Sequence, residues 1–159
     1  VKENVFNILK HSNLVNVRIE NSNVLDLYSG IGSFGIECIS RGAKKVAFIE
    51  QDMIAANTLK KNLVELSIEN KSIIYRNKIE DVLQKDLKEK YHIFFLDPPF
   101  SDIHFYLNLK LAKEKKIFEK NHVVIIHREN KSHDEFKDIL NIIKINQYGR
   151  SKIIFGFFS

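Results

Sequence analysis

The sequence has a single cysteine, Cys38, among its 159 residues. One cysteine cannot form an internal disulfide or supply a thiolate cage for a metal, so we interpret Cys38 as a small core residue in a reducing compartment. The sequence also lacks an apolar run long enough to cross a membrane and the basic, then apolar, start of a signal peptide. It has no repeats, low-complexity tracts or linkers rich in proline or glycine. We therefore expect a single domain over residues 1–159, in the cytoplasm and without a membrane partner.

The composition is that of a folded protein with a slight excess of basic residues. Hydrophobic residues make up 44% and aromatic residues 11%, which is enough to fill a core. Lysine and arginine outnumber aspartate and glutamate by 25 to 20, and this charge favours anionic partners. The preference is weak, because basic pairs such as Lys44-Lys45 and Lys60-Lys61 are typical of solvated faces. The chain starts at Val1 without an initiator methionine, and we expect that residues of a longer protein precede it.

Short β-prone runs alternate with helical patterns along the chain, as in βαβ units that build a parallel sheet. The expected helices cover residues 1–10, 33–41, 52–66, 79–88, 102–115 and 134–140. The expected strands cover residues 24–28, 45–50, 72–76, 92–97 and 122–127. Two further β-prone runs, 142–148 and 152–158, lie too close together for a crossover helix and should pair as an antiparallel hairpin. The sequence predicts an α/β fold with a mostly parallel sheet of about seven strands.

A glycine-rich segment, residues 30–35, has the pattern G-x-G-x-x-G between an expected strand and an expected helix. Glu50 follows at the end of the next strand, at the spacing of a carboxylate that binds a nucleotide ribose. NAD would satisfy this pattern too. However, Asp26 stands in the first strand, where a carboxylate suits a cationic amino-acid group better than a pyrophosphate, and only one complete nucleotide-binding half is present. These features favour S-adenosylmethionine as the cofactor.

The fourth strand ends at Asp97-Pro98-Pro99-Phe100, beside the first strand, where doubly wound sheets bind ligands. Two consecutive prolines remove two N–H donors, so an amino group placed here meets only carbonyl and carboxylate acceptors. The amine of a nucleobase is a poor nucleophile, and acceptors on both of its protons can aim its lone pair at a methyl group. Phe100 would stack on the base, which has to leave its helix or loop. We predict that these four residues are catalytic.

The remaining candidates have weaker patterns. The histidines His104, His122, His127 and His133 lack metal-ligand spacing, and we predict no metal site and interpret them as surface or pairing residues. His104 follows the catalytic turn and could approach a substrate phosphate. Arg128 follows the fifth strand at the same edge of the sheet, where a salt bridge would cap that edge.

Residues 26–37, 40–43, Glu50 and 97–100 closely resemble the bacterial small-subunit ribosomal RNA guanine-N2 methyltransferases of the RsmD type. The resemblance extends almost from end to end. It implies a Rossmann-like class I S-adenosylmethionine-dependent methyltransferase fold, with the final hairpin as its antiparallel part. It also implies a basic β-rich arm that this sequence does not include. The cofactor-binding residues that we predict are Asp26, Tyr28, Gly30, Gly32, Glu50, Gln51 and Asn77, the last of these facing the adenine.

The function that the resemblance implies is methyl transfer to the exocyclic N2 of a guanine. The implied partner is ribosomal RNA or the small ribosomal subunit, and we expect a monomer. The turn at residues 97–100 suits adenine N6 of DNA or RNA equally well. Two alternatives from other classes are an NAD-dependent oxidoreductase and an inactive RNA-binding subunit.

Overall fold

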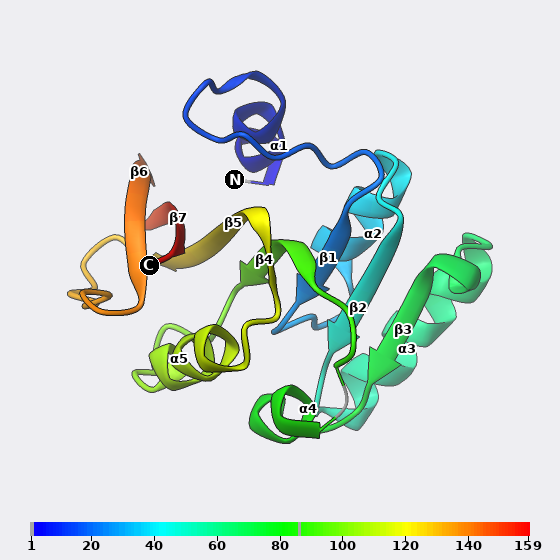
Figure 1. Ribbon diagram of the computed structural model, residues 1–159. Coiled ribbons are helices and arrows are strands. Elements are labelled where there is room, and N and C mark those ends of the chain that lie inside the picture. Colours follow the sequence, from blue (N-terminus) through cyan, green and yellow to red (C-terminus); the bar gives the residue numbers. More distant parts are fainter. Residues whose placement is uncertain (1, 86) are drawn as a thin grey trace.

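The fold is a seven-stranded sheet with helices on both faces (Figure 1). The computed structural model describes residues 2–85 and 87–159, so Val1, at the start of the first expected helix, lies outside the described residues. The helices are α1 (Lys2–His11), α2 (Ser33–Ser40), α3 (Met53–Glu65), α4 (Ile79–Lys85) and α5 (Phe105–Lys115), with a short 3₁₀ turn at Glu69–Lys71. The strands are β1 (Asn23–Asp26), β2 (Lys45–Ile49), β3 (Ser72–Tyr75), β4 (Tyr91–Leu96), β5 (Phe118–Glu129), β6 (Leu140–Tyr148) and β7 (Ser151–Phe158).

The strand order is β3-β2-β1-β4-β5-β7-β6. Strands β1 to β5 are parallel, and β7 pairs antiparallel with both β5 and β6. The chain moves outward from β1 to β3 and then returns to place β4 on the other side of β1. The order therefore reverses between β1 and β4, which is the position where such sheets bind ligands. The predicted Rossmann-like α/β fold with a C-terminal antiparallel hairpin is confirmed.

The core has two layers, one on each face of the sheet. Helices α1, α2 and α3 pack on one face, and α4 and α5 pack on the other. In β4, Ile93 and Phe95 point into the first layer while Phe94 and Leu96 point into the second, so this central strand is buried on both faces, as predicted. Cys38 is fully buried in the first layer, as expected. Within the described residues, no helix is both long and apolar enough to cross a membrane.

The helix predicted at residues 134–140 is wrong. Residues 137–139 form only a turn, and Leu140 already belongs to β6. The physical reason lies at Asp134, whose carboxylate is bound by the Arg128 guanidinium at 3.1 Å and by the Ser132 hydroxyl at 2.6 Å. These bonds tie the start of the segment to the end of β5, and only a turn forms before β6 begins, against the helical pattern of its apolar residues.

Some predicted boundaries also differ. Strand β5 begins at Phe118, four residues before the expected start, because Phe118 extends the pairing with Tyr91 of β4. Strand β1 ends at Asp26 rather than residue 28. Helix α5 begins at Phe105 rather than residue 102, because the Asp102 backbone N–H donates to the Pro99 carbonyl at 2.8 Å in a separate turn.

Candidate active site

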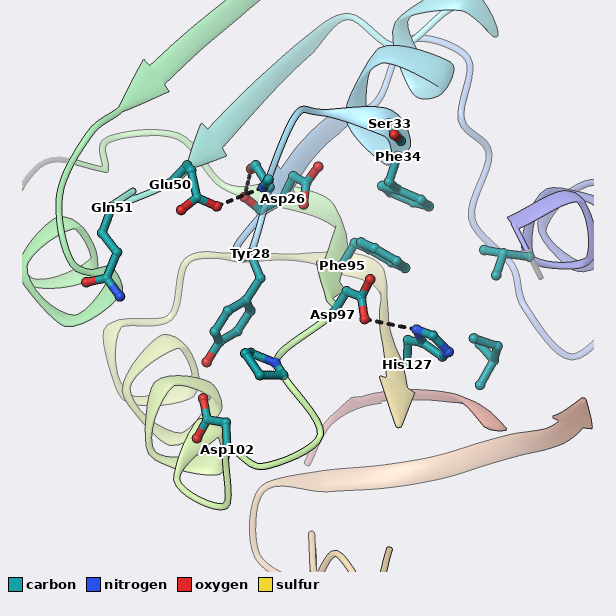
Figure 2. A pocket seen from close by; sticks show the side chains of 15 residues that line it. Asp26, Tyr28, Ser33, Phe34, Glu50, Gln51, Phe95, Asp97, Asp102 and His127 are labelled. Atoms are coloured by element: carbon teal, nitrogen blue, oxygen red, sulfur yellow. Dashed lines mark hydrogen bonds and ion pairs between the residues drawn. The ribbon is translucent and has the colours of Figure 1, made fainter. Parts of the chain in front are cut away.

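A cavity of about 680 Å³ opens at the carboxyl ends of β1, β2, β4 and β5, where the strand order reverses (Figure 2). It brings together seven of the residues predicted from the sequence, from three separate segments of the chain. These are Asp26, Tyr28, Gly30, Glu50, Gln51, Asp97 and Pro99. The remaining lining residues were not predicted: Val5, Ser29, Ser33, Phe34, Phe95, Asp102, His127 and Ile153.

The glycine turn forms one wall of the cavity. Gly30 and Gly32 both have left-handed backbone conformations, with φ of 57° and 92°. A Cβ on Gly32 would also lie 2.3 Å from the Leu59 side chain, so both the backbone conformation and the packing require glycine at this position. The Glu50 carboxylate accepts hydrogen bonds from the backbone N–H groups of Gly30 at 2.8 Å and Asp52 at 2.9 Å. Glu50 therefore holds the turn and keeps lone pairs free for a ligand hydroxyl.

Asp26 is the most buried acid of the site, with 1% of its surface exposed. Its Oδ2 accepts a bond of 3.3 Å from the Gly35 backbone N–H, whereas its Oδ1 has no hydrogen-bond partner among the described residues. Burial raises the pKa of Asp26 to about 7, the Gly35 bond opposes this shift, and the nearby Asp97 and Glu50 carboxylates add to it. Such an acceptor is suited to a cationic donor.

The cavity is lined by acidic side chains. Four carboxylates line it (Asp26, Glu50, Asp97 and Asp102), and the lining residues that the structure describes include neither lysine nor arginine. The rest of the wall includes Phe34 and Phe95, whose rings stack with their centroids 3.9 Å apart. An acidic cavity with apolar walls favours a ligand that is cationic and partly apolar, and it disfavours a pyrophosphate.

The turn after β4 is held from both sides. On the side of the cavity, Oδ1 of Asp97 lies 2.9 Å from Nδ1 of His127 in β5 (Figure 2). A second contact comes from Arg128, which donates a hydrogen bond of 3.3 Å to the Pro99 carbonyl. The buried guanidinium of Arg128 also pairs with Asp134 and lies 4.4 Å from the ring centroid of Phe105. The expected salt bridge of Arg128 is present, and it anchors this turn as well as the sheet edge.

Tyr28 closes the side of the cavity toward α5. Its hydroxyl accepts a bond of 2.9 Å from the Asn108 side chain. Burial raises the pKa of Tyr28 to about 12, and the nearby Asp102 carboxylate contributes to the shift. The phenol therefore stays protonated at neutral pH and acts as a hydrogen-bonding group, not as a base.

Four predicted residues do not line the cavity. Gly32 supports the turn from behind, and Pro98 is buried beneath the turn. Asn77 is exposed just beyond the end of β3. Phe100 is 41% exposed and lines a neighbouring hollow, and its ring meets that of His127 edge to face at 5.6 Å between centroids. His104 is an exposed N-cap residue of α5 and does not reach the cavity.

From the sequence, His127 is interpreted as a surface or pairing residue, and the structure shows it paired with Asp97, but its place in the site was not predicted. A signal was available, because residues that follow neighbouring parallel strands share one edge of the sheet, and β5 was expected beside the catalytic turn. Val5 of α1 and Ile153 of β7 had no such signal.

The sheet order and the cavity at the switch point are those of Rossmann-like methyltransferases. A solved protein of Streptococcus pyogenes described only as conserved and hypothetical superposes with a TM-score of 0.86 at 22% identity, covering 100% of this chain and 96% of that one. A protein of Haemophilus influenzae assigned as a methylase superposes with a TM-score of 0.80 at 28% identity, covering 98% and 94% of the two chains.

The profile of the family Conserved hypothetical protein 95 matches residues 1–157, and the chain belongs to this family, the RsmD family. Several relatives are named ribosomal RNA small subunit methyltransferase D. That of Buchnera aphidicola from Acyrthosiphon pisum is 38% identical over 71% of this chain and 59% of its own length. That of Haemophilus influenzae is 37% identical over 81% of this chain and 65% of its own length. The matched part of this chain thus spans less than two thirds of either relative.

Proposed function

We propose that the protein transfers a methyl group from S-adenosylmethionine to the exocyclic N2 of a guanine in small-subunit ribosomal RNA. The observation that carries the proposal is the acidic cavity at the switch point, with the unpaired Asp26 oxygen in its wall and Asp97 at its mouth. The names of the relatives in the same family support the choice of ribosomal RNA. We propose further that the protein acts as a cytoplasmic monomer and needs no metal.

The donor groups of the cavity fit S-adenosylmethionine better than NAD. The unpaired Oδ1 of Asp26 would accept from the ammonium of the methionine moiety, and Glu50 would accept from the ribose hydroxyls. Tyr28, Gln51 and Asn77 would lie along the adenine. NAD would bring a pyrophosphate into a cavity whose described lining has four carboxylates and no lysine or arginine.

The chemistry at the turn depends mainly on positioning and charge. S-adenosylmethionine supplies, when bound, a methyl group on a sulfonium that departs as a neutral thioether. Asp97 would accept a hydrogen bond from the amine and orient its lone pair toward that methyl group. The amine nitrogen would lose one proton on methylation, and the Asp97 carboxylate would accept that proton. The Asp97 side chain is 48% exposed, so the proton can pass from it to solvent.

The acceptors at the mouth of the cavity favour guanine over adenine. The Watson–Crick edge of guanine carries two adjacent donors, N1–H and the N2 amino group, which Asp97 Oδ2 and the backbone carbonyls of the turn would accept together. The amino group of adenine lies beside N1, which is an acceptor and requires a donor. The two prolines supply no N–H donor, and Phe100 is exposed enough to stack on an extruded base.

The proposal is tested by mass analysis of nucleosides after incubation with RNA and S-adenosylmethionine carrying a deuterated methyl group. Naked ribosomal RNA and small ribosomal subunits serve as separate substrates, and Asp97→Ala is the matched control. Labelled N2-methylguanosine supports the proposal, and labelled N6-methyladenosine would identify adenine instead of guanine as the target base. Calorimetry with S-adenosylmethionine and with NAD decides the cofactor. RNA binding without cofactor binding or methyl transfer would identify an inactive RNA-binding subunit.

A further inference from the structure

His127 lies in register with the catalytic turn. Leu96, the last residue of β4, pairs with Ile126 of β5, so the residues that follow them, Asp97 and His127, lie at the same edge of the sheet. His127 also pairs with Ile153 of β7 on its other side. Its backbone is thus paired with β7 inside the sheet, whereas Asp97 has already left β4. The histidine is the fixed member of the pair.

The environment of the imidazole defines its tautomer. Nδ1 lies 2.9 Å from the Asp97 Oδ1. Nε2 is buried, and no polar group of the described residues lies within hydrogen-bond distance of it. A proton on Nε2 would be a buried donor without an acceptor, which is costly. The neutral ring therefore carries its proton on Nδ1 and donates it to Asp97.

This bond divides the tasks of the two Asp97 oxygens. Oδ1 accepts from the histidine, and Oδ2 stays available for the amine. The Asp97 side chain is 48% exposed, whereas that of His127 is 21% exposed. An exposed aspartate can rotate freely, and a misaimed acceptor does not orient the lone pair of the nucleophile. The His127 ring also meets Phe100 edge to face, so it contacts the two side chains of the turn that would touch the base.

We propose that His127 is a positioning residue that holds the Asp97 carboxylate for methyl transfer, an inference that rests on the function proposed above. It exerts this role through Asp97 and not through a hydrogen bond to the cofactor. Its loss therefore lowers the rate of the transfer step and leaves cofactor affinity unchanged.

Three substitutions separate the hydrogen bond from the packing of the ring. His127→Phe keeps the ring volume without a donor, and we expect the single-turnover rate to fall by about 10- to 100-fold. His127→Asn places its amide N–H at the position of Nδ1, and we expect it to retain the rate within about threefold. His127→Gln moves the amide one bond farther out and should resemble His127→Phe.

Cofactor affinity by calorimetry and the KM for RNA should change by less than about threefold in all three variants. His11→Phe, at the exposed end of α1, is the control for a surface histidine.

A double-mutant cycle tests the route through Asp97. In an Asp97→Ala background, His127→Phe should cause no further loss of rate, because the carboxylate that it positions is gone. Wild-type transfer by His127→Phe, an equal loss in both backgrounds, or a His127→Asn rate as low as that of His127→Phe would each overturn the inference while leaving the proposed function intact. Absence of methyl transfer by the wild-type protein would instead overturn the proposed function, and the positioning role with it. Nitrogen-15 NMR of the imidazole then reports separately whether the Nδ1–H tautomer exists and whether Asp97→Ala abolishes it.

Discussion

Replacement of Asp26 by asparagine should stabilise the free protein and weaken cofactor binding. Asp26 is fully buried, and its pKa is raised from 3.8 to about 7. Its folded-state pKa is raised, so the folded protein holds this proton more tightly than the unfolded chain does. The stability associated with the proton is present below about pH 4 and is lost as the pH rises toward 7. Above pH 7 the ionised carboxylate lowers the free energy of unfolding by a constant amount.

The size of this cost follows from the shift. About three pKa units correspond to about 4 kcal/mol at pH 8. Asparagine keeps an acceptor for the Gly35 N–H but adds a buried amide donor, which costs about 1 to 3 kcal/mol. We therefore expect Asp26→Asn to raise the free energy of unfolding by about 1 to 3 kcal/mol at pH 8, or its melting temperature by several degrees. At pH 5 the gain should be smaller or absent, because Asp26 is then protonated in the folded protein.

Cofactor binding should change in the opposite direction. An ionised Asp26 would form a charge-assisted bond with the ammonium of S-adenosylmethionine, and its loss should weaken binding by about 10- to 100-fold. In the wild-type protein the affinity should rise with pH up to about 7 and then level off. Thermal unfolding at pH 5 and pH 8, with calorimetry at both, measures all of these effects. A variant that is less stable at pH 8 and binds the cofactor as tightly as the wild type would refute this account of Asp26.

Three further predictions concern the rest of the site and the sheet. Glu50→Ala should weaken cofactor binding by about 1 to 3 kcal/mol through lost charge-assisted bonds, and unchanged affinity by calorimetry would remove Glu50 from the site. Asp97→Ala should keep cofactor affinity within about tenfold and slow single-turnover transfer about a hundredfold or more, and wild-type turnover would contradict its role. His122 accepts a bond of 3.0 Å from the Phe158 N–H, and burial lowers its pKa, so its contribution to stability is lost as the pH falls below about 6.5. His122→Gln, whose amide oxygen can take the Nε2 position, should flatten that part of the stability curve in denaturant titrations at pH 5 and pH 7.

The local parts of this fold could be predicted because local chemistry decides them. The glycine turn requires left-handed backbone at Gly30 and Gly32, which other residues rarely adopt, and the paired prolines end β4 wherever it packs. Alternation of apolar runs with helical patterns was enough for the order of the elements up to β5. The prediction of a helix at residues 134–140 was wrong because the conformation of this segment depends on the salt bridge between Arg128 and Asp134. This is a tertiary contact, which the periodicity of the sequence does not show.

The class of fold, the glycine turn and the acceptor-rich turn at Asp97 could be predicted, since each depends on residues that are neighbours in the chain. How these parts act on one another follows from tertiary contacts that local sequence does not contain. Asp26 acquires its raised pKa from burial and from carboxylates that arrive on other strands, and His127 acquires its partner from the register of β5 on β4. Both depend on which side chains the sheet places next to each other, and that placement is decided by packing across the whole domain.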